Sequence, residues 1–277
     1  MMNSKAKKLF IVYILLAFFV LIAGFPFFWM ISTSLKSNTE VATIPPQILP
    51  PEPDWSSYIK VWTDSNFLTY FLNSLKVASI TTAISVVLAI AAGLGFARFK
   101  FRWSSKLQMI VLFAQLFPLV LLVTPYYTIM RNLKILNTHA SLILAYISFI
   151  LPFSIWMLTN YFKAIPPEME EAAMVDGCSR LAALIKVTIP LSAPGIVATT
   201  INAFTMAWNE FLFAQTFINS PELRTLPIGL RSFMGQYNTE WNLLMAGAVV
   251  STLPVVIIFI FLQKQLISGL TAGGVKG

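Results

Sequence analysis

The chain has 277 residues, of which 57% are hydrophobic, 14% aromatic and 11% charged. Soluble domains carry charge on about a quarter of their residues, so this composition excludes an ordinary soluble protein and indicates a chain embedded in a bilayer. The formal net charge of +8 does not indicate nucleic-acid binding, because no basic patch is interleaved with aromatic residues.

Six uncharged runs are each long enough for a helix that crosses the bilayer, which takes about 20 residues. A strand architecture is not expected, because the alternating pattern of a barrel is absent and open sheet edges have no partners in lipid. The sequence therefore predicts an all-α membrane protein with six transmembrane helices. In chain order the runs cover residues 9–31, 77–97, 107–130, 140–162, 187–209 and 241–263.

The first run has the basic flank of a secretory signal, since Lys5, Lys7 and Lys8 precede it. It is longer than the 7 to 15 residues of a signal core, and no small-x-small cleavage site follows it. We therefore expect a retained membrane helix. Five prolines between residues 45 and 53 then predict an extended segment outside the membrane, because proline at this density does not sustain a helix.

Basic residues are divided unevenly between the two sides of the predicted membrane. Twelve of the 19 lysines and arginines fall on the side of the N-terminus, and the other seven are spread over longer, partly acidic loops. The positive-inside rule therefore places both termini in the cytoplasm. The twelve are Lys5, Lys7, Lys8, Arg98, Lys100, Arg102, Lys106, Lys163, Arg180, Lys186, Lys264 and Lys276; the seven are Lys36, Lys60, Lys76, Arg131, Lys134, Arg224 and Arg231.

The polar loop at residues 163–190 carries the signals of a short helix. Pro166 and Pro167 can open it, and three glutamates follow in its first turn, where the helix dipole favours negative charge. Gly177 offers a stop, because glycine tolerates the left-handed conformation that often follows a helix.

A second short helix is predicted directly afterwards, at residues 180–189. Its apolar positions and one hydroxyl are spaced along one face, and Pro190 forces a break. A helix–turn–helix on the cytoplasmic side follows from these patterns. The residues of that face are Leu181, Leu184, Ile185 and Thr188.

The fifth run ends at Glu210, a carboxylate in apolar surroundings. Trp208 and Asn209 precede it, and Asn202 lies two helical turns before Asn209 on the same face. Ionisable groups within hydrocarbon are costly and usually face a cavity, a partner or the path of a transported solute. Two interpretations stay open: these four residues belong to a substrate pathway, or Asn209 and Glu210 cap or cross-link helices near the outer surface.

No catalytic residues, cofactor site or metal site are predicted in this chain. One cysteine, Cys178, and one histidine, His139, leave no cluster of metal ligands. The sequence lacks the Gly-x-x-x-x-Gly-Lys-Ser/Thr phosphate cradle, so the chain is not expected to hydrolyse ATP. No nucleophile, base and orienting group can be assembled from its motifs, and we expect no enzyme.

One stretch resembles the EAA loop of ABC importer permeases, which reads Glu-Ala-Ala, three residues, Gly, nine residues and Ile-x-Leu-Pro. This chain keeps that spacing and has Val187 and Ile189 in place of Ile and Leu. The resemblance implies the type I ABC importer permease fold, with six transmembrane helices and a cytoplasmic coupling helix that docks on a separate ATPase subunit. The residues implied in that coupling are Glu171, Ala172, Ala173, Asp176, Gly177 and Pro190.

Three further segments are similar to carbohydrate-importing members of that family. They are the Asn73-Ser74 lead-in to the second run, which a helix cap would also explain, the Trp208–Phe211 string and the glycine-rich end from Gly269. In maltose-type permeases, a loop placed like residues 220–242 reaches into the soluble sugar-binding protein. The resemblance therefore implies import of a sugar or oligosaccharide by alternating access.

The resemblance also implies the partners and the location. The partners are a second permease subunit, two ATPase subunits that bind ATP and Mg, an extracytoplasmic sugar-binding protein and membrane lipid. The chain is then a multi-pass protein of the cytoplasmic (inner) membrane, with cytoplasmic tails at residues 1–8 and 266–277 around a permease domain at residues 9–265. An ion-coupled secondary transporter with Glu210 as its ion site is the alternative, although no internal repeat supports it.

Overall fold

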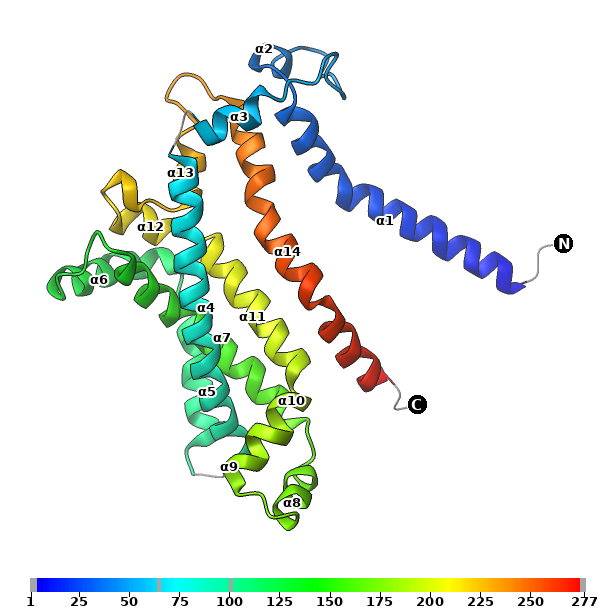
Figure 1. Cartoon of the computed structure of the whole chain (residues 1–277), viewed down its shortest axis with the longest axis vertical. Helices are drawn as coiled ribbons and strands as arrows, with labels where there is room; N and C mark the ends of the chain where they lie inside the picture. The colour runs from blue at the N-terminus through cyan, green and yellow to red at the C-terminus, as the bar shows by residue number, and fades with distance from the viewer. Residues whose placement is uncertain (1–3, 64–65, 100–101, 275–277) are drawn as a thin grey trace. The chain divides into compact units, whose positions relative to one another are not determined.

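The computed structural model describes residues 4–63, 66–99 and 102–274. Within these ranges the chain is mostly helical, and an isolated antiparallel bridge between Met234 and Thr239 takes the place of any strand (Figure 1). Lys100, residues 1–3 and residues 275–277, which include Lys276, lie outside the described residues. The predicted all-α fold is confirmed.

Six apolar segments match the six predicted spans. Two of them are helix pairs bent at a short break, so the count is four unbroken helices, or six when each pair is one span. The outermost helices are longer than predicted: they begin at Ser4 and continue to Gly274, within the segments expected as tails. The four unbroken helices are α1 (Ser4–Ser34), α4 (Phe67–Arg98), α7 (His139–Lys163) and α14 (Trp241–Gly274).

The third span is broken at a proline. It consists of α5 (Ser104–Phe113), the short η1 (Ala114–Leu116) and α6 (Leu119–Asn132), and its two parts are bent by 98°. Pro118 precedes α6, and Phe117 before it has an extended ψ of 125°, as the steric demand of a following proline requires. Pro118 therefore marks a sharp break in this span.

The segment that leads into the fifth span contains a π-helical turn. The polar loop forms α8 (Glu168–Val175), α9 (Arg180–Ala183), the π-helix η2 (Leu184–Thr188) and α10 (Ile189–Leu191). Then α11 (Ala193–Trp208) and α12 (Leu212–Phe217) follow, after a bend of 71°. Pro190 lies inside α10, and the π turn before it accommodates the proline, which lacks an N–H and crowds the preceding turn.

The exposure of four side chains shows that the predicted single face of this helix is wrong. Leu184 and Thr188 are 6% and 0% exposed, whereas Leu181 and Ile185 are 68% and 54% exposed. In an unbroken α-helix the four side chains would share one face. In the structure the four residues instead form one buried pair, Leu184 and Thr188, and one exposed pair, Leu181 and Ile185.

The chain divides into two compact units. Unit 1 comprises Met1–Leu68 and Gly229–Leu253, and unit 2 comprises Thr69–Ile228 and Pro254–Gly277. In unit 1, residues 42–55 between α2 (Asn38–Val41) and α3 (Ser56–Thr63) form no helix, as the prolines predict. The remaining short helices are η3 (Pro221–Leu223) and α13 (Leu226–Arg231).

A buried lysine orders the proline-rich segment of unit 1. Lys36 Nζ donates a hydrogen bond to the carbonyl of Gln47 and lies 4.8 Å from the centroid of the Trp29 ring. Burial lowers the pKa of Lys36, and the nearby Glu40 carboxylate partly opposes this effect. The contacts fix the loop that follows α1.

The core of unit 2 lies where α4 and α7 pack closely. Ala89, Leu158 and Phe162 are fully buried there. A Cβ atom at Gly93 of α4 would lie 3.2 Å from the Phe162 ring and 3.2 Å from the backbone N of Thr159. The two helices are thus in close contact at Gly93, where an added side chain would require its neighbours to shift.

Asn73 and Ser74 lie inside α4, so the helix-cap interpretation of this pair is wrong. Asn73 Nδ2 donates hydrogen bonds to the carbonyls of Glu222 and Arg224, and the hydroxyl of Ser74 accepts one from the backbone N–H of Leu226. The pair therefore ties α4 to the loop around η3, which lies about 150 residues further along the chain.

Candidate functional site

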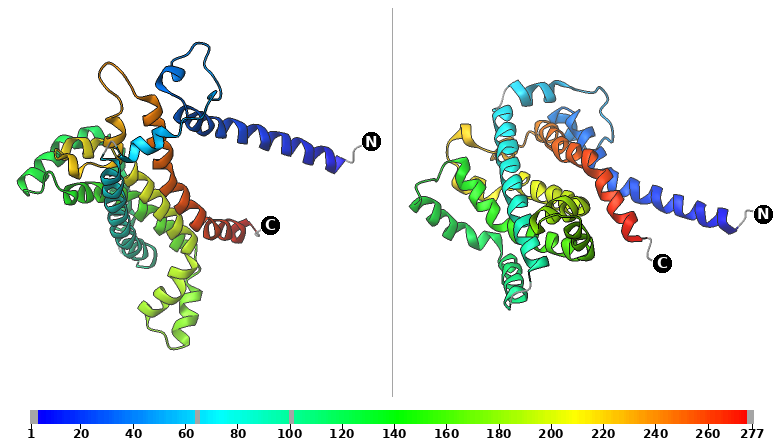
Figure 2. Two further views of the ribbon diagram at one scale, coloured as in Figure 1. Left: turned by 45° about the horizontal axis from the view of Figure 1, so that its top comes forward. Right: turned by 60° about the horizontal axis from the view of Figure 1, so that its bottom comes forward.

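A protruding hairpin of two short helices forms the most distinctive surface of unit 2. Figure 1 labels α8 and α9 at one end of the unit, and the left view of Figure 2 shows the yellow-green hairpin extending from it. The turn between them is a Schellman motif, because the N–H of Cys178 bonds to the carbonyl of Ala173 and that of Gly177 to Met174. Gly177 has φ +91°, which confirms the predicted helix stop.

The buried residue of α8 is a glutamate, and its large apolar side chains are exposed. Glu170 is 8% exposed, whereas Met169 is 48%, Met174 is 38% and Val175 is 88% exposed. This is the reverse of a helix that packs its apolar side inward. Among the residues predicted for coupling, Glu171, Ala172, Asp176 and Gly177 are exposed on the hairpin, Ala173 is half-buried, and Pro190 lies in α10.

Glu170 forms a buried ion pair with Arg98, and sequence reasoning missed it. Arg98 Nε, at the end of α4, lies 2.6 Å from Glu170 Oε1, and both side chains are buried. The hydroxyl of Thr188 in η2 donates a second hydrogen bond to the same oxygen, at 2.5 Å. We call Arg98, Glu170 and Thr188 the anchor cluster.

The guanidinium of Arg98 also reaches the end of α7. Its Nη1 donates to the carbonyl of Phe162 at 2.8 Å, and its Nη2 donates to that of Ile165 at 3.1 Å. Carbonyls at a helix C-terminus lack intrahelical partners, and a cation there is favoured by the helix dipole. Arg98 therefore joins the ends of α4 and α7 to the first turn of α8.

A second contact joins α9 to the same end of α4. The guanidinium carbon of Arg180 lies 4.6 Å from the centroid of the Phe99 ring, a cation–π arrangement. Arg180 Nη2 is also 3.5 Å from the carbonyl of Arg98.

The sequence signal for the anchor cluster is weak. Arg98 stands among basic residues whose distribution already indicated the side of the membrane, and Glu170 is one of three glutamates in one helical turn. Nothing in a single turn with Glu168, Glu170 and Glu171 says which carboxylate faces the protein. The position of Arg98 directly at the end of an apolar run is the one available indication.

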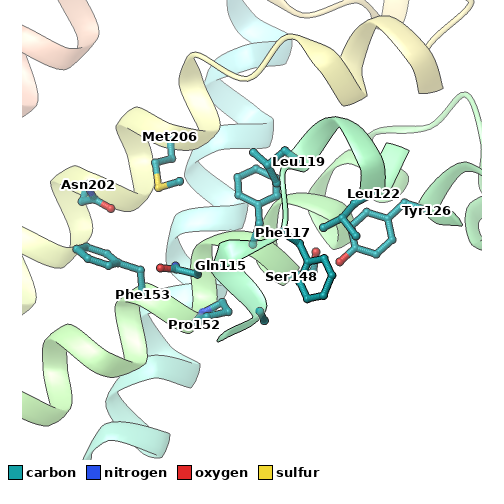
Figure 3. A pocket seen from close by; sticks show the side chains of 12 residues that line it. Gln115, Phe117, Leu119, Leu122, Tyr126, Ser148, Pro152, Phe153, Asn202 and Met206 are labelled. Atoms are coloured by element: carbon teal, nitrogen blue, oxygen red, sulfur yellow. The ribbon is translucent and has the colours of Figure 1, made fainter. Parts of the chain in front are cut away.

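A cavity of about 480 Å³ lies among the segments from η1 to α6, α7 and α11 (Figure 3). Aromatic rings, two side-chain amides and hydroxyls line it, and none of the lining residues carries a full charge. Asn202 and Met206 contribute from α11, opposite Gln115. The lining residues are Ala114, Gln115, Phe117, Leu119, Leu122, Tyr126, Ser148, Phe149, Pro152, Phe153, Asn202 and Met206.

The other three predicted pathway residues lie elsewhere in unit 2. Trp208 is 3% exposed, and its ring centroid is 5.6 Å from those of Phe71 and Phe204. Asn209 is exposed, and its amide donates a hydrogen bond to the carbonyl of Thr205 at 2.9 Å.

Glu210 caps a helix. Its carboxylate accepts hydrogen bonds from the backbone N–H groups of Phe213 at 2.8 Å and Ala214 at 3.2 Å, in the first turn of α12. Local capping is thus one role of Glu210, and the structure brings only Asn202 of the four predicted pathway residues into the cavity. Within the described ranges, no group of three His, Cys, Asp or Glu side chains could hold a metal ion.

Comparison with known proteins defines the class. Residues 85–271 match the family model of the binding-protein-dependent transport system inner membrane component. The chain belongs to this family of membrane transport proteins, which are permeases of ABC importers rather than enzymes.

Several relatives have names that specify a cargo. The chain is 38% identical to the sulfoquinovosyl glycerol transport system permease protein SmoH of Agrobacterium fabrum, over 91% of this chain and 89% of the relative. It is 35% identical to the trehalose/maltose transport system permease protein MalG of Thermococcus litoralis, over 93% of each. It is also 35% identical to the diacetylchitobiose uptake system permease protein DasC of Streptomyces coelicolor, over 91% of this chain and 92% of the relative.

Solved structures show the same fold. A chain of a bacterial ABC transporter for import of the acidic polysaccharide alginate superposes with a TM-score of 0.77 at 24% identity, covering 95% of this chain and 98% of that one. A chain of the methionine ABC transporter MetNI, in an inward-facing conformation, gives a TM-score of 0.61 at 15% identity and covers 73% and 95%. The type I permease fold is therefore confirmed.

Family and fold together establish the function at the level of class. The chain is a membrane-spanning permease component of a binding-protein-dependent ABC importer, located in the inner membrane. These findings give no support to an ion-coupled secondary transporter.

Proposed function

We propose that this chain is one of two permease subunits of an importer for a sugar or oligosaccharide. The names of the relatives support this, since trehalose, maltose, diacetylchitobiose and sulfoquinovosyl glycerol are all carbohydrates or their conjugates. Transport proceeds by alternating access between an inward-facing and an outward-facing conformation. Each partner binds one conformation more tightly and so shifts the populations of these two conformations.

The hairpin is the proposed docking surface for an ATPase subunit. It is the main observation that supports the proposed function. Met169, Met174 and Val175 each expose an apolar side chain on α8 that unit 2 leaves uncovered, and Glu171 is exposed on the same short helix. Exposed apolar patches of this kind mark interaction sites, and a carboxylate beside one can pair with a basic group of the partner. Ala172, Ala173, Asp176 and Gly177 belong to the same surface, and Pro190 ends the segment that returns to the membrane.

The remaining partners follow from this arrangement. ATP and Mg are bound by two ATPase subunits, so this chain needs no cofactor of its own. Both termini and the hairpin face the cytoplasm, and residues 9–265 form the permease domain between the tails. On the outer side, the bridge between Met234 and Thr239 presents Tyr237, which is 94% exposed, as a contact for the sugar-binding protein.

The cavity of unit 2 is the proposed part of the substrate pathway in this subunit. Aromatic rings can stack on the apolar faces of a sugar, and amides such as those of Gln115 and Asn202 can hydrogen-bond its hydroxyls. Trp208, Asn209 and Glu210 do not line this cavity and stay predictions for the pathway. Trp208 and Glu210 contact other residues of this chain, and Asn209 is exposed.

Variants of Gly177 test the proposed docking. No atom lies within 4 Å of a Cβ placed there, so a larger residue meets open space in this chain and only a bound partner would clash with it. A Gly177→Leu complex in proteoliposomes should insert normally and lose ATP hydrolysis stimulated by the loaded binding protein. A loss of activity in Gly177→Leu can come from a clash with the partner or from backbone strain. Gly177→Asn separates these two causes, because asparagine tolerates positive φ with little strain.

The expected order of stimulated ATPase activity is wild type, then Gly177→Asn, then Gly177→Leu. Undiminished stimulation in Gly177→Leu, with normal amounts of assembled complex, contradicts the docking surface. If the purified wild-type complex contains no ATPase subunit, the whole proposal is contradicted.

A further inference from the structure

We propose that Arg98 and Glu170 are positioning residues that transmit movement of the hairpin to α4 and α7. This inference rests on the proposed docking of an ATPase subunit on α8. It assigns a role to the anchor cluster, which lies behind the docking surface and contains none of the residues predicted for coupling.

The hairpin needs a noncovalent link to α4. Along the chain, α8 follows α7 through a short turn, and η2 leads into α11 across the bend of 71°. By contrast, 72 positions separate Arg98 at the end of α4 from Glu170 in α8. A force applied to α8 therefore reaches α4 through side-chain contacts.

The Arg98 guanidinium suits this task because its donors are fixed in one plane. Nε binds Glu170, Nη1 binds the carbonyl of Phe162 and Nη2 binds that of Ile165, all within 3.1 Å. A rigid fork with three occupied directions resists both rotation and translation of its partners. The side chains of Arg98 and Glu170 are 7% and 10% exposed, so water screens their attraction little.

Thr188 extends the link to the far side of the hairpin. Its hydroxyl donates to the same carboxylate oxygen that accepts from Arg98, and Thr188 belongs to η2, which precedes α10 and α11. One carboxylate thus joins the first turn of α8 to the end of α4 and to the segment that enters the fifth span. Movement of α8 without movement of α4 would leave a buried charge unpaired, which is strongly unfavourable.

The test measures solute imported per ATP hydrolysed, in proteoliposomes that contain the complete transporter and its binding protein. A residue that only stabilises the chain changes the amount of assembled complex, and it leaves this ratio unchanged. Arg98→Gln and Glu170→Gln keep the approximate size of each side chain and remove its charge. Arg102→Gln is the matched control, because Arg102 is an exposed arginine just beyond the same helix end.

We expect each of the two variants to lower the ratio by between about twofold and thirtyfold, the range typical of mutations along a coupling network. The double variant should be no worse than the more severe single variant, because both residues act through one contact. Arg102→Gln should keep the wild-type ratio. An unchanged ratio in either single variant, or losses that multiply in the double variant, overturns the inference.

Thr188→Val keeps the inference testable if the charge variants do not assemble. It removes one hydroxyl, leaves the ion pair in place, and should lower the ratio by a smaller factor. If no charge variant assembles and Thr188→Val retains the wild-type ratio, the inference fails. A wild-type complex without an ATPase subunit refutes the proposed docking instead, whereas a coupled wild type with equally coupled variants refutes only the role of the anchor cluster.

Discussion

Two glutamates in apolar surroundings, Glu170 and Glu210, are stabilised in different ways. Glu170 accepts hydrogen bonds from Arg98 and Thr188, which lie 72 and 18 positions away. Glu210 accepts from the backbone of Phe213 and Ala214, three and four positions away. The first carboxylate joins separate elements through an ion pair, and the second caps the next helix and lies beside the Tyr146 hydroxyl of α7.

This difference shows why a charge next to a hydrophobic run is an ambiguous signal. Glu210 stands alone at the end of a span and attracts attention as an intramembrane site, yet its carboxylate accepts hydrogen bonds from N–H groups of the next helix. Glu170 stands among other glutamates and looks like a solvated cap, yet it is 8% exposed. Helix N–H groups offset the cost of burying the charge of Glu210, and a cation, Arg98, offsets it for Glu170.

The largest expected effect comes from breaking the ion pair on one side. Arg98→Met leaves the Glu170 carboxylate buried without its cation, which should destabilise the protein by about 3–5 kcal/mol. Chemical unfolding in detergent measures the change, with Arg102→Met as the exposed control. Adding Glu170→Leu to Arg98→Met should recover part of the loss, because both charges are then removed. Equal stability of Arg98→Met and wild type contradicts the burial of the pair.

A smaller effect is expected at Glu210. Glu210→Ala removes the cap of α12 and should cost about 1 kcal/mol in the same unfolding assay. Glu210→Gln keeps an oxygen that can accept both N–H groups, so its stability should stay close to that of the wild type. Transport separates the two interpretations of this residue. Normal import by Glu210→Gln supports a capping role alone, and lost import at normal stability places the charge in the substrate pathway.

The smallest effect on stability is expected at Asn202. Its side chain lines the cavity, so Asn202→Ala should change the free energy of unfolding by less than about 0.5 kcal/mol. Loss of one hydrogen bond to a bound sugar should instead raise the KM of import by about twofold to tenfold. Uptake of radiolabelled sugar at several concentrations measures this. An unaltered KM removes Asn202 from the proposed pathway and leaves the comparison of Glu170 with Glu210 intact.

Much of the architecture was predictable because its causes are local. The length and composition of uncharged runs determine where a helix can cross hydrocarbon, and all six runs reappear as apolar helical segments. The stop at Gly177 is local too, since a Schellman turn needs a residue that adopts positive φ, and glycine does so without strain. Even the extended segment between α2 and α3 follows from its prolines alone.

The tertiary structure decided what those local rules leave open. Sequence pattern places Leu181, Leu184, Ile185 and Thr188 on one face, but packing buries Leu184 and Thr188 and leaves the other two exposed. Asn73 and Ser74 have the chemistry of a cap, but they bind a loop about 150 residues away.

By itself, the sequence determined that this is a helical membrane protein with a helix–turn–helix in a polar loop and little free charge in its spans. Only the tertiary structure decided which of three glutamates turns inward to meet Arg98, and which polar residues of α11 reach a cavity. The physical reason is the range of the interactions. Hydrophobic length, turn chemistry and charge bias act within one segment, whereas a buried ion pair depends on the packing of helices that are distant in the chain.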